Sequence, residues 1–186
     1  MKKYFVIIAL ILGMIPSSSY SSPFVIEGLK HIDVKGGLIQ AGKWKQTPTV
    51  VICQYSPASR KQVETAIMWW ARRGYKFNPL ISVEDDRSQE ICNSPNPAGY
   101  ILIRLVTQVI LSELENDLGV THFYVDNLTQ DVNFGIIYLP NHIEKRVIEH
   151  ELGHALGWMH TDEIGHLMHS KWIRGGWKDA GLKIDR

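Results

Sequence analysis

Residues 147–170, VIEHELGHALGWMHTDEIGHLMHS, hold three histidines, a glutamate and a glycine at fixed spacing. His150 and His154 are four residues apart, so a helix through this segment places both imidazoles on one face. Two imidazoles do not complete a tetrahedral zinc site, and His160, which follows a turn at Gly157, is the predicted third ligand. Three protein ligands leave the fourth position for water, which is typical of a catalytic zinc site.

The carboxylate of Glu151 is predicted to act on that water. Its position next to His150 turns it away from the line of the ligands but keeps it close to the same helix face. Zinc lowers the pKa of bound water toward about 7, and a nearby glutamate can serve as the general base. The alternative is an amphipathic helix with surface histidines, but the five fixed positions of H-E-x-x-H-x-x-G-x-x-H rarely coincide by chance.

The rest of the chain has the patterning of one α+β domain. A helical period begins after Ser59 and stops at Gly74, which predicts a long helix. Residues 85–99 are rich in Pro, Asn and Gly and predict a loop, and residues 112–119 predict a short helix. Apolar and β-branched runs predict strands at residues 47–56, 78–86, 100–106, 121–127 and 134–140.

The metal-binding helix is predicted to cover about residues 142–156. Asn141 is a suitable N-cap, with Glu144 three residues later as its reciprocal partner. Gly157 suits the left-handed position that ends a helix.

In the motif H-E-x-x-H-x-x-G-x-x-H the sequence resembles the metzincin metallopeptidases, which bind zinc through this motif. It most resembles the matrixins, the matrix metalloproteinase-like group, because Met168 follows His160 by eight residues, as in a matrixin Met-turn. The order of the predicted elements over about residues 44–170 is also similar. The resemblance implies one α+β zincin-like domain with a twisted, mostly parallel sheet and one antiparallel edge strand. It also implies a backing helix, a zinc-binding helix and a small C-terminal lobe with the Met-turn.

The resemblance also implies roles for individual residues. His150, His154 and His160 would bind one catalytic zinc ion, Glu151 would be the base, and Met168 would form the apolar floor beneath the metal. Arg146 would lie near the specificity pocket. The upper rim of the cleft, where an extended substrate could pair by strand addition, would be formed by Gly135, Ile136, Ile137, Tyr138 and Leu139. A simple edge strand without a ligand is the alternative for this rim.

Several features depart from the matrixin pattern and indicate a compact, divergent, bacterial relative. Residues 22–45 contain no cysteine that could block the zinc, and His169 and Ser170 follow Met168 where matrixins commonly have proline. After the Met-turn, WKDAGL (residues 177–182) is the remaining candidate for a C-terminal helix. The structural calcium and second zinc of animal matrixins do not transfer, and a calcium site stays undetermined. His122, Asp126 and His142 are candidates for a further metal site, with ordinary surface residues as the alternative. His166 and His169 flank Met168 and are candidates for contact with the metal.

The N-terminus has the layout of a secretory signal peptide. Lys2 and Lys3 precede an apolar run, residues 4–15, and small residues follow it up to a cleavage site after Ser21. We therefore expect a signal peptide at residues 1–21, a mature domain at residues 22–186, and a secreted or periplasmic protein without a stable membrane anchor. An uncleaved anchor is the alternative, although the run is short for a membrane span.

Charge and cysteine content fit an exported protein. Removal of the two leader lysines leaves 18 basic and 19 acidic side chains, so nothing favours a nucleic-acid partner. Export favours a disulfide between Cys53 and Cys92, with two buried thiols as the alternative.

The sequence thus predicts a secreted, monomeric, zinc-dependent endopeptidase that acts on a protein or peptide substrate. Two alternatives remain open. One is a secreted binding protein that keeps zinc only to stabilise its fold, and the other is a zinc hydrolase with a non-peptide substrate.

Overall fold

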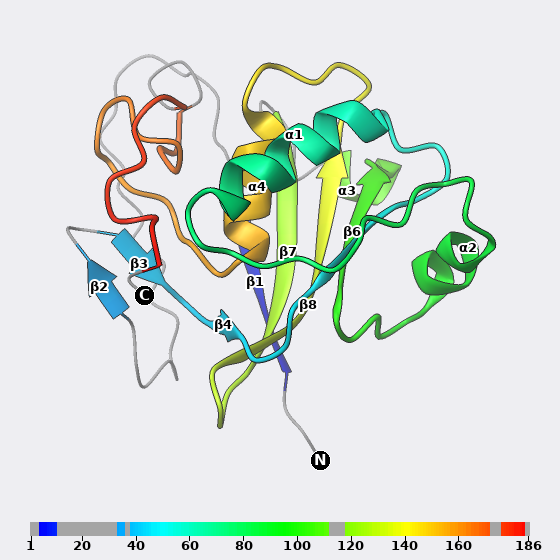
Figure 1. Cartoon of the computed structure of the whole chain (residues 1–186), viewed down its shortest axis with the longest axis horizontal. Coiled ribbons are helices and arrows are strands. Elements are labelled where there is room, and N and C mark those ends of the chain that lie inside the picture. The colour runs from blue at the N-terminus through cyan, green and yellow to red at the C-terminus, as the bar shows by residue number, and fades with distance from the viewer. Residues whose placement is uncertain (1–3, 11–32, 36–37, 112–117, 172–175, 185–186) are drawn as a thin grey trace.

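The computed structural model describes residues 4–10, 33–35, 38–111, 118–171 and 176–184. It has an α+β fold with a mostly parallel sheet, as the sequence predicts (Figure 1). The strands are β1 (Tyr4–Leu10), β2 (Asp33–Lys35), β3 (Leu38–Gln40), β4 (Lys43–Trp44), β5 (Thr49–Ile52), β6 (Tyr100–Leu105), β7 (Val120–Asp126) and β8 (Asp131–Leu139). The helices are α1 (Arg60–Ala71), α2 (Asp86–Asn93), α3 (Gln108–Leu111) and α4 (Val147–Ala155).

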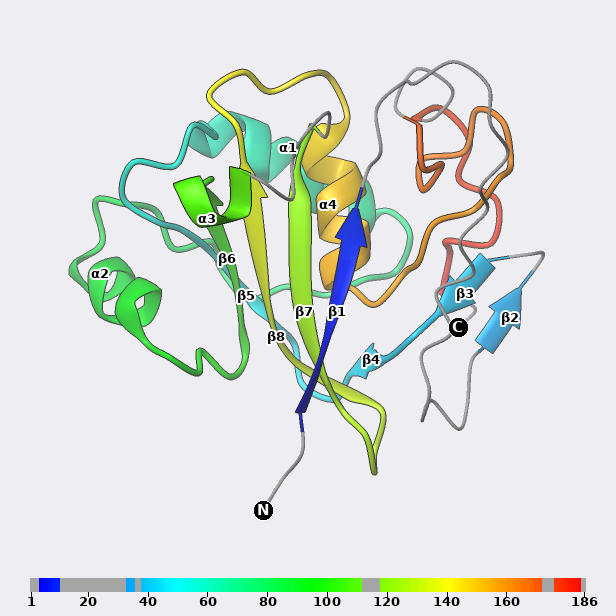
Figure 2. The same ribbon diagram turned by 180° about the vertical axis from the view of Figure 1, so that it is seen from behind.

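The main sheet runs in the order β1-β7-β8-β6-β5, and the short β4 pairs with the start of β8. Strands β5, β6 and β8 are parallel, whereas β7 is antiparallel to β8 and β1 is antiparallel to β7. Figure 2 shows β1 and β7 side by side at one end of the sheet. The strand that runs antiparallel to β5, β6 and β8 is therefore β7, and β1 pairs with its other edge.

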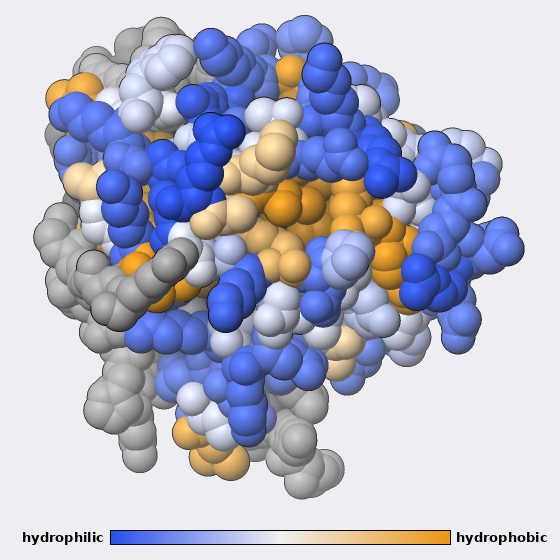
Figure 3. Space-filling view, viewed as in Figure 1, coloured by the Kyte–Doolittle hydropathy of each residue, from blue (hydrophilic) through white to orange (hydrophobic). Residues whose placement is uncertain are grey.

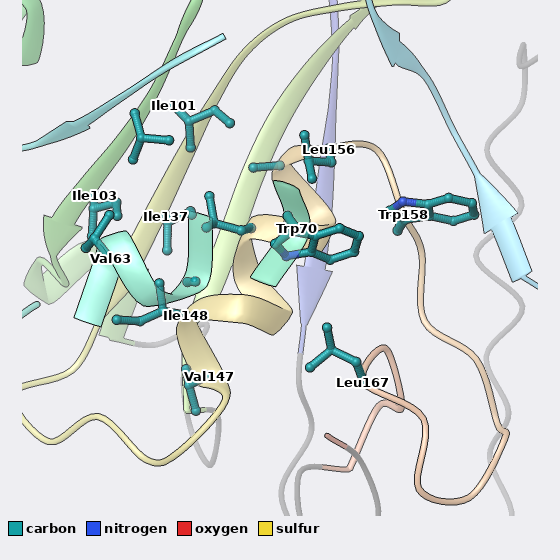
Figure 4. Packing of buried hydrophobic residues seen from close by; sticks show 14 of the residues in the cluster. Val63, Trp70, Ile101, Ile103, Ile137, Val147, Ile148, Leu156, Trp158 and Leu167 are labelled. Carbon is teal, nitrogen blue, oxygen red and sulfur yellow. The ribbon is translucent and has the colours of Figure 1, made fainter. Parts of the chain in front are cut away.

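The core lies between the sheet and the helices α1 and α4. Figure 4 shows Val63 and Trp70 of α1, Ile148 of α4 and Ile101 and Ile103 of β6 packed together. Because side chains alternate along a strand, Leu102 points to the opposite face, where it packs with Cys53 and Ile81 and against Ile91 of α2. Both faces of β6 are therefore covered, which explains its continuous apolar sequence.

The apolar core reaches the surface on the side of α1. Ile67, Phe77 and Leu80 pack against the core but remain partly exposed. Figure 3 shows hydrophobic side chains in a strip across the middle of this face, surrounded by hydrophilic ones.

Most of the predicted strands are confirmed, as is the long helix. Ser59 caps α1 by a capping box with Gln62, and Gly74 has the positive φ, 97°, that suits a helix stop. The predicted strand at residues 78–86 is wrong, because this segment makes only one parallel bridge, between Val51 and Ile81. Pro79 has no N–H to donate, which limits pairing there.

The predicted loop at residues 85–99 is wrong in its first half, which forms α2. The Asp85 side chain accepts a hydrogen bond from the Arg87 N–H and so caps this helix. Residues 112–117 of the other predicted short helix lie outside the described residues. The helix predicted within residues 177–182 is wrong, because Lys178 instead bridges to His166 and the segment forms turns.

The start of α4 also differs from the prediction. Asn141 and Glu144 do not cap it. The helix begins at Val147, and its N-cap residue Arg146 has a left-handed φ of 73°. Glu144 instead lies 3.1 Å from the Nε2 of His142. The end of α4 is confirmed, since Gly157 has a φ of 94° and a Cβ there would collide with the main chain of Gly42.

The segment predicted as a signal peptide contributes β1 in the full chain. Residues Tyr4–Leu10 pair with β7 from Asp126 back to Val120. Residues 11–21, which include the predicted cleavage site after Ser21, lie outside the described residues. Among the helices described, none combines the length and hydropathy that crossing a membrane requires.

The predicted disulfide between Cys53 and Cys92 is confirmed. It joins the end of β5 to α2 across 39 residues, with the two Cα atoms 5.8 Å apart. This bond is the covalent tie between α2 and the sheet.

Replacing both cysteines by alanine should lower the free energy of unfolding by about 4 kcal/mol, because a loop of this length is no longer closed in the unfolded chain. Urea unfolding of the purified mature protein measures this difference. A reducing agent should produce a similar loss in the native protein and no change in the double variant. Equal stability with and without the bond would contradict this expectation.

Candidate metal centre

Three imidazoles from α4 and the loop after it converge on one point. The Nε2 atoms of His154 and His150 are 3.0 Å apart, those of His154 and His160 are 3.0 Å apart, and those of His150 and His160 are 3.3 Å apart. Nitrogen ligands about 2.0–2.1 Å from a tetrahedral ion would be separated by about 3.3–3.4 Å. These histidines could therefore hold a metal ion, as the spacing of the motif predicts.

The protons on two of these rings are placed by main-chain carbonyls. The Nδ1 of His150 lies 2.6 Å from the Leu167 oxygen, and the Nδ1 of His154 lies 2.7 Å from the Trp158 oxygen. A carbonyl oxygen can only accept, so each Nδ1 must carry the proton. In the neutral rings both Nε2 atoms then present lone pairs to each other, which is unfavourable unless a cation lies between them. Hydrogen bonds from Nδ1 to a main-chain carbonyl commonly orient histidines that bind a metal through Nε2.

Burial keeps the three histidines neutral. Desolvation lowers the pKa of His150 to about 4 and that of His160 to about 3, and it holds the pKa of His154 well below its ordinary value. Neighbouring imidazoles of the cluster lower the pKa values of His154 and His160 further, because a second positive charge nearby would be repelled. The neutral imidazole is the form that binds a metal.

The metal-free protein should lose stability as the pH falls from about 6.5 toward 4. The pKa of His150 is near 6.5 in the unfolded chain and about 4 in the folded one, so unfolding takes up a proton in this range. The loss should approach about 1.4 kcal/mol per pH unit for each such histidine. Urea unfolding at a series of pH values measures it.

In His150→Asn, the free energy of unfolding should depend less steeply on pH than in the native protein. The matched control is His142→Asn, since the His142 side chain is 86% exposed and is not part of the cluster. If the free energy of unfolding changes equally with pH in the native protein and in His150→Asn, the pH dependence does not come from His150.

Met168 packs directly beneath α4. It is fully buried, and a Cβ at Gly153 would collide with its sulfur and lie 2.8 Å from Cζ2 of Trp70. The loop that carries Met168 is fixed to the segment after the third histidine by a hydrogen bond of 2.9 Å from the Thr161 N–H to the Met168 oxygen. The predicted position of Met168 below the histidine-bearing helix therefore agrees with the contacts.

Gly153→Ala should destabilise the protein by about 1–3 kcal/mol through overpacking against Met168 and Trp70, although alanine favours a helix by about 1 kcal/mol. Thermal or urea unfolding tests this. Combining Gly153→Ala with Met168→Ala should cost less than the sum of the two single changes, because the smaller side chain makes room. A gain in stability in Gly153→Ala would contradict the packing.

Glu151 lies against the first residues of β7. It is fully buried, and its Oε2 accepts a hydrogen bond of 2.6 Å from the Thr121 hydroxyl. The main chain of Gly119 is so close that a Cβ there would lie 2.9 Å from Oε1. Thr121 and Gly119 were not predicted, because nothing in the motif identifies partners about thirty residues upstream.

Residues 135–139, predicted as the upper rim of the cleft, do not form an edge strand. Gly135, Ile136, Ile137, Tyr138 and Leu139 belong to β8, which pairs with β6 on one side and with β7 on the other. Its main chain has no free side to receive a substrate strand. The strand that borders Glu151 is β7, and its outer side is paired with β1.

Arg146 immediately precedes α4, as its sequence position requires. Its guanidinium lies 3.4 Å from Glu149 and 5.8 Å from the centre of the Trp69 ring. With Ile143 and Ile148 it lines a cavity of about 330 Å³. Its role in substrate selection stays a prediction.

The other candidate residues do not join the three histidines. The His142 side chain is exposed, Asp126 accepts hydrogen bonds from the turn after β7, and the His122 ring packs edge-on against Tyr138. The Nδ1 of His166 accepts from the Met168 N–H, and that of His169 accepts from the Lys171 N–H, so both support the loop. Across the described ranges, the one group of histidine, cysteine or acidic residues that could hold a metal is His150, His154 and His160.

Comparisons with known proteins do not add to this description. The chain matches no family model, no curated protein and no solved structure. What the site can do therefore follows from its own residues.

Proposed function

We propose that this protein is an exported zinc-dependent endopeptidase of metzincin type. One observation carries the proposal. Three neutral imidazoles direct their Nε2 atoms at one point, those of His150 and His154 without a proton, and a buried glutamate follows the first of them in the chain. A structural metal site needs no such carboxylate.

The donor set favours zinc. Imidazole nitrogens suit zinc, and three of them leave the fourth tetrahedral position for water or a substrate oxygen. Other divalent transition metals also accept imidazole ligands, so the choice of zinc rests on this preference and on the resemblance of the motif.

The chemistry divides between the metal and the glutamate. A zinc ion bound here supplies a Lewis acid that polarises the peptide carbonyl and lowers the pKa of water. Glu151 takes the proton of the attacking water and returns it to the leaving amine. The carbonyls of Leu167 and Trp158 keep the Nδ1 protons in place, so His150 and His154 hold their orientation during the reaction.

The arrangement of the fold supports this proposal. The order β5, α1, β6, β8 and α4 is the order that the matrixin resemblance implies, and Met168 lies under the helix as a Met-turn methionine would. The antiparallel strand beside the site is β7 rather than residues 135–139. An extended substrate would add to the outer edge of β7 once the leader strand β1 has been removed with the signal peptide.

A second candidate is a secreted binding protein that uses zinc only to stabilise its fold. The complete burial of Glu151 favours it, because a general base must reach the water that it deprotonates. Such a protein would bind one zinc per chain and unfold at a higher temperature with it, but would cleave no peptide.

Glu151→Gln should retain one zinc per chain but lose turnover by roughly 10²–10⁴-fold, because the amide cannot take a proton. Elemental analysis gives the zinc content, and cleavage of a mixed peptide library, with and without a chelator, gives the activity. The control is His154→Ala, which should lose both zinc and activity. Undiminished cleavage by Glu151→Gln would contradict the mechanism, and zinc binding without any cleavage by the native protein would favour the binding protein.

A further inference from the structure

The Glu151 side chain is held by a residue outside the histidine motif. The Thr121 hydroxyl lies 2.6 Å from the Glu151 Oε2 and 3.2 Å from the Glu151 main-chain oxygen. One hydroxyl has one proton, and the shorter distance is that of a hydrogen bond to a carboxylate. The proton of Thr121 is therefore directed at the side chain.

Thr121 is itself rigidly placed. It is fully buried and lies within β7, where it pairs with Ile137 of the central strand β8. A β-branched side chain has restricted rotation about χ1, and the pairing of β7 with the central strand β8 holds its main chain in place. The donor is therefore fixed relative to the sheet and, through the 2.6 Å contact, so is the Glu151 carboxylate.

Gly119 lies beside the same carboxylate. A Cβ at this residue would lie 2.9 Å from Oε1 and 3.0 Å from Cδ of Glu151. These distances are shorter than ordinary van der Waals contact, so any larger residue would displace the carboxylate. Thr121 in β7 thus supplies a hydrogen-bond donor, and Gly119, just before this strand, leaves room for the Glu151 side chain.

We infer that Thr121 is a positioning residue for Glu151. Its hydroxyl fixes one carboxylate oxygen and, with it, the rotamer of the side chain. Gly119 leaves the space that this rotamer occupies. The inference rests on the proposed function for its catalytic consequence, but the hydrogen bond itself can be tested without activity.

The kinetic test compares Thr121→Val with Thr121→Ser in the zinc-loaded mature protein. Valine keeps the shape of threonine without the hydroxyl, and serine keeps the hydroxyl. Thr121→Val should lower kcat roughly 10–100-fold, as expected for loss of one hydrogen bond to a charged group. KM and zinc content should stay within about threefold of the native values, and Thr121→Ser should recover most of kcat. Equal kcat in the valine variant and the native protein would overturn the catalytic part of the inference.

The test without activity is a double-mutant cycle in the metal-free protein, with Thr121→Val and Glu151→Leu. In the native background, Thr121→Val leaves a buried carboxylate without this donor and should lower the folding equilibrium constant about tenfold or more. In the Glu151→Leu background both partners are apolar, and the same change should cost less than about threefold. Urea unfolding of the four proteins measures both effects.

The two tests separate the inference from the proposed function. Equal effects of Thr121→Val in both backgrounds would overturn the hydrogen bond as a positioning contact. Coupling in the cycle together with no cleavage by the native protein would retain the contact and overturn the peptidase.

Discussion

The candidate metal centre depends on two hydrogen bonds from imidazole to main chain. His150 donates to Leu167 and His154 donates to Trp158, so both acceptors lie in the segment after α4. These bonds fix the tautomer of each ring and also tie the loop to the helix. The ligand nitrogens and the position of Met168 therefore have a common origin, namely the path that the chain takes after Gly157.

The sequence predicts the parts of this site that are close together along the chain. The four-residue interval between His150 and His154 needs only helical geometry, and the stop at Gly157 needs only the left-handed preference of glycine. The pairing of Cys53 with Cys92 was predictable because the described chain offers no other partner and export favours oxidation. Local rules are sufficient for each of these predictions.

The parts that the sequence did not predict depend on register and on strand order. Thr121 meets Glu151 because β7 runs antiparallel to β8 and passes over α4, and no local pattern records that contact. Strands at residues 121–127 and 134–140 were predicted, but which of the two lies toward the outside of the sheet is decided by β6, which pairs with β8. The start of α4 was misplaced for a similar reason. Asn141 is a good cap in isolation, yet the chain turns at Arg146 before the helix begins.

The pairing of β1 with β7 also has a consequence in time. Residues Tyr4–Leu10 are synthesised before the strand that they pair with, and Leu10 precedes its partner Val120 by 110 positions. At about 5–20 residues per second, the partner strand is made roughly 5–20 s later. During that interval the segment cannot form its pairing with β7. These residues can therefore form β1 only after β7 has been made.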